Sequence, residues 1–136
     1  RQAVADGVKQ IAFGDLFLED IRRYREEKLA GTGLKPLFPV WGKDTAVLAR
    51  DMIAAGLRKH VSVIDKSKLD ASFAGRMFDA KFLSDLPAGI DPCGENGEFH
   101  TCVSAGPMFM HALHLTPGEV VDRDGFVFAD LVLNTR

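Results

Sequence analysis

The residues with the greatest potential for chemistry are concentrated in one stretch, Asp91-Pro92-Cys93-Gly94-Glu95-Asn96-Gly97-Glu98-Phe99-His100-Thr101. Gly94 and Gly97 can adopt positive φ angles and let a second backbone approach closely. The dipeptide Asn96-Gly97 is a strong turn signal, with Glu95 and Glu98 on either side of it. Two carboxylates on a tight glycine loop suit a metal ion, an amine, or a substrate that needs a complementary charge.

Simpler interpretations of the same residues stay open. An acidic turn is often a solvated surface feature, because most charged side chains are exposed. Asp91, Glu95 and Glu98 could instead supply the oxygen ligands of a divalent cation. A zinc site could be drawn from Cys93, His100 and Cys102, but their spacing matches none of the usual structural zinc patterns. We therefore expect no zinc site at Cys93, His100 and Cys102, and we expect both cysteines to be reduced.

Composition narrows the class of protein. The 136 residues are 46% hydrophobic and 26% charged, which is typical of one globular domain or a large part of one. The formal net charge of −2 gives no general attraction to nucleic acid or to an anionic membrane, so nucleic acid is not an expected partner. No apolar run approaches the ~20 residues of a membrane span. Two cysteines do not form a disulfide framework, and a cytoplasmic location is expected.

The first two thirds of the chain have the pattern of βαβ units. The apolar run at residues 11–13 predicts a short strand, and Asp15 is a candidate N-cap for the following helix. In that helix Phe17, Ile21 and Tyr24 would form one apolar stripe. Residues 34–41 predict an extended segment, residues 44–55 a second helix, and residues 60–65 another strand. A short helix is expected at residues 79–86.

After the acidic loop the periodicity changes to that of an antiparallel meander. Residues 99–104 alternate with period two, and strands are expected at 111–115, 119–122 and 126–133. Asp124-Gly125 predicts a hairpin turn between the last two strands. The fold class is therefore α/β, with part of a Rossmann-like parallel sheet at residues 1–90 and a small, mainly antiparallel β subdomain at residues 91–136.

Several motifs resemble the diphthine–ammonia ligase family, a group within the PP-loop, or adenine nucleotide alpha hydrolase-like, superfamily. The motifs are Gly14-Asp15 after a strand, Leu37-Phe38-Pro39-Val40-Trp41-Gly42, Gly75-Arg76, and Gly94-Glu95-Asn96-Gly97-Glu98-Phe99-His100-Thr101. The last carries every fixed position of the family pattern Gly-Glu-x-Gly-Glu-[Tyr/Phe]-x-Thr. His100 stands where the family commonly has glutamate.

The resemblance implies an ATP-dependent, AMP-forming ligase. A substrate carboxylate, small or borne on a protein, would be activated by adenylation and then attacked by ammonia to give an amide. ATP is the implied cofactor, with Mg²⁺ as its candidate companion. The resemblance assigns catalytic roles to Glu95 and Glu98, substrate contacts to Gly94, Asn96, Gly97, Thr101 and Arg76, and nucleotide contacts to Gly14 and Asp15.

The superfamily holds pyrophosphate with a Ser-Gly-Gly-x-Asp-Ser loop after its first strand. No such stretch occurs in these 136 residues. The chain also begins at Arg1 within a helix-like pattern, so the resemblance places that loop upstream and predicts that this piece is inactive alone. Two other functions remain open: a binding module that dimerises through the edge of the C-terminal meander, and a metal-dependent hydrolase that uses Asp91, Glu95 and Glu98.

Overall fold

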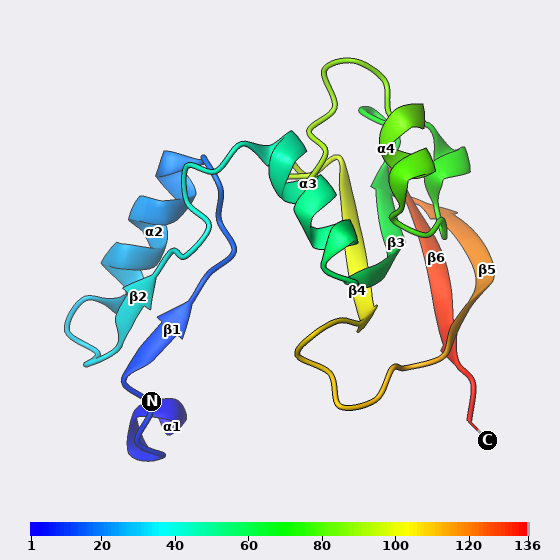
Figure 1. Ribbon diagram of the computed structural model, residues 1–136. Helices are drawn as coiled ribbons and strands as arrows, with labels where there is room; N and C mark the ends of the chain where they lie inside the picture. The colour runs from blue at the N-terminus through cyan, green and yellow to red at the C-terminus, as the bar shows by residue number, and fades with distance from the viewer. Residues whose placement is uncertain (136) are drawn as a thin grey trace. The chain divides into compact units, whose positions relative to one another are not determined.

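The structure is a computed structural model that describes residues 1–135. It contains two compact units, Arg1–Asp44 and Thr45–Arg136, drawn in blue to cyan and in cyan-green to red (Figure 1). The sequence predicted a boundary near residue 90. In the second unit, β3 (Arg58–Asp65), which precedes residue 90, pairs with β4 (Phe99–Ala105), which follows it.

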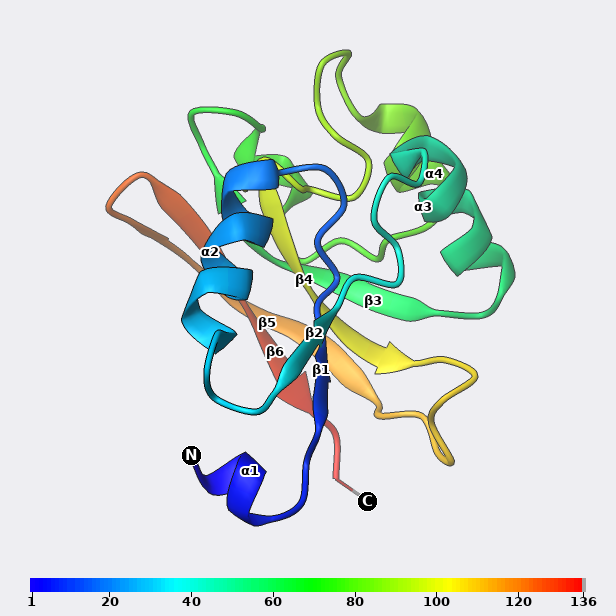
Figure 2. The same ribbon diagram turned by 90° about the vertical axis from the view of Figure 1, so that its left-hand side faces the viewer.

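The first unit is one βαβ element. Strands β1 (Gln10–Ala12) and β2 (Lys35–Leu37) pair in parallel, and α2 (Glu19–Leu29) connects them. Figure 2 shows α2 beside the two strands. A short helix, α1 (Gln2–Ala5), precedes β1. The parallel pair confirms the first predicted βαβ unit.

Aromatic rings and arginines fix the segment that leaves β2. Phe13 stacks on Phe38 at 5.7 Å between centroids, and Trp41 meets Phe38 edge-on. The guanidinium of Arg22 on α2 lies 4.5 Å from the Phe38 centroid and 4.8 Å from that of Trp41. Cation–π contacts of this kind contribute roughly 0.5–2 kcal/mol each. Trp41 therefore anchors the unit that contains it.

The predicted start of α2 and its apolar stripe were wrong. The helix begins at Glu19, after Leu18 as N-cap, so Phe17 lies outside it. Ile21 and Tyr24 are exposed in the structure. Asp15 does not cap the helix. Its carboxylate instead accepts a hydrogen bond from Arg25, which lies in the second turn of α2.

The second unit is a four-stranded antiparallel sheet in the order β4-β3-β6-β5. Strand β5 (Leu115–Arg123) and strand β6 (Phe126–Leu133) form the predicted hairpin. Asp124 and Gly125 between them have φ angles of 53° and 85°, which the mirror-image hairpin turn requires. Residues 111–114, expected in a strand, form a loop instead.

Helices cover one face of this sheet, and the core lies between. α3 (Thr45–Ala54), the 3-10 turn η1 (Ala71–Phe73) and α4 (Ala80–Asp85) contribute Ala49, Phe73 and Phe82 to the buried cluster. The rings of Phe78, Phe82 and Phe99 lie within 5.1–6.3 Å of one another. Burial of these rings stabilises the unit.

The chain is α/β, as predicted, but the prediction of a second βαβ unit was wrong. Strand β3 pairs antiparallel with both β4 and β6 rather than continuing the parallel pair of β1 and β2. Its buried residues Val61 and Ile64 are separated by a register shift, which turns both toward the helices. In the part of the chain that is described, no helix has the length and apolar character needed to cross a membrane.

Candidate functional site

The acidic stretch forms a loop between α4 and β4, and glycine geometry sets its path. Gly94 and Gly97 have φ angles of 67° and 76°. A Cβ atom at Gly94 would lie 2.7 Å from the carbonyl oxygen of Phe99, a distance that real Cβ atoms do not adopt. At Gly97 the nearest atom to such a Cβ is Lys68 Nζ, 4.0 Å away. Gly94 is therefore required by its backbone angle and by the space around it.

Asp91 organises the first turn of the loop. Its Oδ2 accepts hydrogen bonds from the backbone N–H groups of Cys93 at 3.1 Å and Glu95 at 3.0 Å. Its carbonyl oxygen accepts a further bond from the N–H of Gly94. An aspartate that accepts from its own following backbone is a common turn element. Asp91 therefore shapes the loop with the oxygens that the hydrolase hypothesis would have given to a metal ion.

Glu98 closes the loop from the inside. Its side chain is 2% exposed, and its Oε2 accepts a hydrogen bond of 2.6 Å from the backbone N–H of Asp91. The other oxygen, Oε1, is buried and has no hydrogen-bond partner among the described residues. The carbonyl of Glu98 accepts from the N–H of Asp65 at the end of β3. The Glu98 carboxylate thus points into the fold and has one unused acceptor.

The surroundings of the loop shift the pKa values of two side chains, Cys93 and Lys59. Burial raises the pKa of the Cys93 thiol to about 11, and the carboxylates of Asp91 and Glu95 act in the same direction. The Cys93 Sγ–H donates to the carbonyl of Thr45 at 3.4 Å. Burial lowers the pKa of Lys59, whose ammonium lies 4.1 Å from the Phe78 centroid. Cys93 is therefore a neutral packing residue at neutral pH.

Glu95 is half-buried and shares the stretch from Asp91 to Thr101 with four candidates for substrate contact: Gly94, Asn96, Gly97 and Thr101. Asn96 is exposed, and its carbonyl accepts a hydrogen bond of 2.6 Å from Lys68 Nζ. Thr101 is paired with Val61 of β3 and is half-buried. Lys68 is a residue that the sequence reasoning missed, because its link to the loop spans 28 positions and no local pattern indicates it.

A hollow of about 220 Å³ lies at the start of the loop. Its walls are mainly apolar and come from α3, from the end of α4 and from the connection to the loop, including Leu86, Ile90 and Pro92. Arg50 of α3 is the charged residue in its lining. Apolar walls with few polar groups are typical of small-molecule sites.

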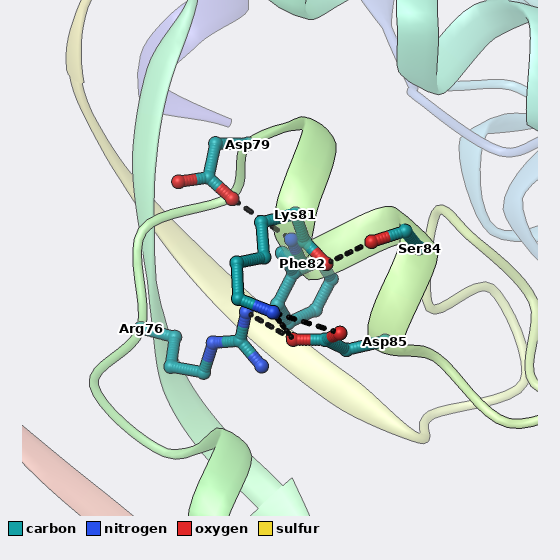
Figure 3. A network of polar contacts seen from close by, with 6 residues as sticks. All are labelled: Arg76, Asp79, Lys81, Phe82, Ser84 and Asp85. Atoms are coloured by element: carbon teal, nitrogen blue, oxygen red, sulfur yellow. Dashed lines mark hydrogen bonds and ion pairs between the residues drawn. The ribbon is translucent and has the colours of Figure 1, made fainter.

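Arg76 lies over the aromatic core and binds a carboxylate of its own chain. Its Nη2 is 3.0 Å from Asp85 Oδ2, and its guanidinium carbon lies 5.1 Å from the Phe73 centroid. Lys81 also binds Asp85, as Figure 3 shows. The bonds from Lys81 and Arg76 lower the pKa of Asp85, with the Lys81 bond having the larger effect. Arg76 therefore holds a carboxylate, but this carboxylate belongs to α4.

Gly14 and Asp15 follow β1 in the first unit. Asp15 accepts two hydrogen bonds from Arg25, from Nε at 2.6 Å and from Nη2 at 3.2 Å. Arg25 also lies 4.4 Å from the Phe13 centroid. A side chain added at Gly14 would meet no atom within 4 Å. The Asp15 carboxylate is thus engaged within the unit, and the surroundings of Gly14 are open.

The residues proposed for metal binding do not assemble into a site. Within residues 1–135, no group of three or more His, Cys, Asp or Glu side chains is placed to hold a metal ion. Asp91, Glu95 and Glu98 therefore do not form the ligand set that a metal-dependent hydrolase would need.

Comparison with known proteins identifies the family. Residues 44–128, more than half of the chain, match the family model for the diphthamide synthase C-terminal domain. Among curated proteins, the chain is 34% identical to diphthine–ammonia ligase of Schizosaccharomyces pombe over 94 residues, covering 66% of this chain and 16% of that protein. It is 28% identical to diphthine–ammonia ligase of Homo sapiens over 128 residues, covering 90% of this chain and 48% of the human protein. The chain thus spans less than half the length of these relatives. The resemblance drawn from the glycine–glutamate motif is confirmed: the chain belongs to the diphthamide synthase C-terminal domain family.

Proposed function

We propose that this chain forms the amide-forming side of an ATP-dependent ligase of the diphthine–ammonia ligase type. The observation that carries the proposal is the family match across residues 44–128, which includes the whole loop from Asp91 to Thr101. The relatives are named for joining ammonia to diphthine. The same substrates are proposed here: a carboxylate and ammonia.

The reaction requires an activated carboxylate that is protected from water. ATP, when bound by such a ligase, supplies a good leaving group on the acyl carbon. The residues of this chain include no Ser-Gly-Gly-x-Asp-Ser loop, so we assign no phosphate contact to them. Their contribution concerns the amine: positioning ammonia and the charged end of the substrate, and excluding water.

Glu95 and Glu98 have different surroundings, and this difference suggests different roles. Glu98 is buried and bonded to the Asp91 N–H, so it holds the loop in one conformation. Glu95 is half-buried, and its backbone N–H is bonded to Asp91. A carboxylate on a backbone held in this way can orient an ammonium or another cationic group without reorganisation. We assign Glu95 the contact with the amine and Glu98 the positioning of that contact.

The remaining site residues follow from their environments. Gly94, Gly97 and the exposed Asn96 offer backbone and amide groups to the substrate, and Thr101 extends the same surface along β4. The nucleotide contact near β1 would come from the backbone of Gly14, because Asp15 is bonded to Arg25. Arg76 would contribute by exchanging Asp85 for a substrate carboxylate. Mg²⁺ would accompany ATP, and the proposed location is the cytoplasm.

The test uses the complete ligase, with a diphthine-containing substrate and ammonium, and measures AMP release. Glu95→Gln removes the charge and keeps the shape; we expect kcat/KM to fall at least about tenfold. Glu119→Gln, an exposed glutamate on β5, is the matched control and should leave the rate unchanged. Wild-type AMP release from Glu95→Gln would contradict the assignment.

A second candidate function is assembly through the sheet edge. β5 is an edge strand of nine residues, so one side of its backbone has no strand partner in the described fold. Such edges readily pair with another chain. A homodimer is the proposed form of this assembly. Light scattering of the 136-residue chain would show twice the monomer mass, and a Val120→Lys variant should restore the monomer.

A further inference from the structure

A hollow with several hydrogen-bond donors in its lining lies in the second unit, near the start of β3, whereas the acidic loop lies near the end of that strand. It has a volume of about 220 Å³. Its lining comes from the start of β3, from Met77, from the end of β4, from the loop that leads into β5, and from the residue after β6. Its polar lining residues are Arg58, His60, Ser104, His114 and Asn134, and no aspartate or glutamate belongs to the lining. The lining of the hollow therefore carries positive charge without acidic residues, although the net charge of the chain is −2.

The hydrogen-bond inventory of this hollow has unused donors. The Arg58 guanidinium makes no ion pair or hydrogen bond with any residue among 1–135, whereas its carbonyl accepts from Ser104 Oγ at 3.3 Å. Asn134 Oδ1 accepts from Thr116 Oγ1 at 2.9 Å, which leaves the Asn134 Nδ2 donor available. Arginine presents its N–H groups in a planar fork that matches the oxygens of a carboxylate or phosphate.

His60 adds an imidazole to the lining of the hollow. It is 8% exposed, and its Nδ1 is buried with no hydrogen-bond partner in the described part of the chain. Its backbone is held on both sides, by Cys102 of β4 and by a bridge to Met77. Buried polar atoms without partners are rare in folded proteins and call for an explanation. Because Nδ1 is buried, a group in the hollow would meet the ring at its other nitrogen, Nε2.

We propose that this hollow binds a small oxyanion, a phosphoryl or carboxylate group, held by Arg58 and by the imidazoles of His60 and His114. The volume of about 220 Å³ accommodates such a group with a few attached atoms. Arg58 supplies the fixed charge, and the histidines supply N–H donors. Nothing in the proposed amide-forming role of the acidic loop requires this site.

The site is distinct from the acidic loop because the two lie at opposite ends of β3. Arg58 begins the strand, and Asp65 ends it beside Glu98. A strand of that length separates its ends by roughly 20 Å. Failure of the ligase proposal would therefore not affect this one, and the two can be tested separately.

Protonation of His60 should be coupled to the anion. Burial, and next the positive charge of Arg58, lower the pKa of His60. The other titratable groups around it are His114 in the lining of the hollow and the Cys102 thiol on the neighbouring strand. An anion beside Arg58 favours the charged imidazole, so binding should raise the His60 pKa and strengthen as pH falls.

The test is an NMR titration of the 136-residue chain with inorganic phosphate and, separately, with acetate. We expect saturable shifts of the His60 and His114 ring signals with a dissociation constant of about 10 mM or lower. Acetate, whose own charge is constant over this range, should bind more tightly at about pH 6 than at about pH 8. Preference for phosphate would identify a phosphoryl ligand, and preference for acetate a carboxylate.

Three variants make the outcome decisive. Arg58→Met keeps the aliphatic stem and should weaken binding by at least about tenfold. Arg123→Met, an exposed arginine at the end of β5, should bind like wild type. His60→Gln should weaken the pH dependence of acetate binding, leaving only the part due to His114, while the amide spectrum stays folded. Shifts that only follow ionic strength, or equal binding by Arg58→Met, would overturn the proposal.

Discussion

The carboxylate of Glu98 accepts a 2.6 Å hydrogen bond from the backbone N–H of Asp91, seven residues earlier, and is almost completely buried while doing so. Asp91 in turn accepts from the N–H groups of Cys93 and Glu95. Each of the two acids thus binds the loop backbone with one of its carboxylate oxygens. A loop fixed in this way presents the intervening glutamate, Glu95, in a defined position.

The first prediction concerns the energetic role of Glu98. Glu98→Ala would leave the Asp91 N–H buried and unpaired and would open a cavity. We expect the free energy of unfolding to fall by about 2–4 kcal/mol. Urea denaturation measures it. Glu98→Gln keeps one acceptor and the shape, so its loss should be about 1 kcal/mol. A loss below about 0.5 kcal/mol for Glu98→Ala would show that the loop closes without this bond.

The second prediction separates backbone strain from steric contact at the two loop glycines. Gly97→Ala adds only the cost of a positive φ angle, about 1 kcal/mol. Gly94→Ala adds the same cost and a Cβ atom 2.7 Å from the Phe99 carbonyl oxygen. We therefore expect Gly94→Ala to destabilise the chain by at least 2 kcal/mol more, roughly, than Gly97→Ala does. Thermal unfolding of both variants tests this, and equal melting temperatures would contradict it.

The third prediction concerns the buried lysine. Burial lowers the pKa of Lys59, so the surroundings disfavour its charged form despite the nearby Phe78 ring. In the unfolded chain the amine keeps its ordinary, higher pKa. Lys59 therefore disfavours folding at neutral pH, and this penalty disappears as pH rises through the unfolded-state pKa. We expect Lys59→Met to raise the free energy of unfolding by about 1 kcal/mol.

Chemical denaturation at neutral and at alkaline pH tests the Lys59 prediction. The gain from Lys59→Met should shrink at alkaline pH, where the amine is neutral in both states. Lys81→Met, which removes an exposed lysine from α4, provides the control for a general effect of charge removal. A loss of stability in Lys59→Met would mean that the contact of the ammonium with Phe78 outweighs its desolvation.

The fourth prediction compares the two thiols. Cys93 has its pKa raised to about 11 by burial. At about pH 8 only about one molecule in a thousand would carry its thiolate. Cys102 is exposed on β4. Iodoacetamide should therefore modify Cys102 first, and Cys93 should react only on unfolding, as peptide mass spectrometry would show. Faster modification of Cys93 would contradict its burial.

The raised pKa of Cys93 also predicts a pH effect on stability. Its folded-state pKa lies above the unfolded-state value, so its contribution is fully present below the unfolded pKa. That contribution is lost as pH rises toward about 11, because the unfolded chain ionises first. A Cys93→Ser variant should show a flatter stability profile over this range than the wild type.

The local elements of the chain follow from its sequence, because they depend on neighbouring residues. The Asp124-Gly125 hairpin, the short helix that begins after Asp79, and the parallel pair of β1 and β2 appear where turn residues and periodicity predict them. The family is equally a property of the sequence. Its glycine–glutamate motif consists of consecutive residues, so it can be recognised from the sequence without the structure.

Only the tertiary structure decided which strands pair and which carboxylate oxygens of the loop are buried. Strand β3 has an apolar pattern that fits either a parallel or an antiparallel neighbour, and its pairing with β4 and β6 depends on residues more than thirty positions away. Glu95 and Glu98 look alike in the sequence, yet burial and the Asp91 N–H make them different. The hollow around Arg58 and His60 combines five separate segments, so no local spacing could have indicated it. Long-range packing determines these features, because burial and hydrogen-bond satisfaction are properties of the folded chain.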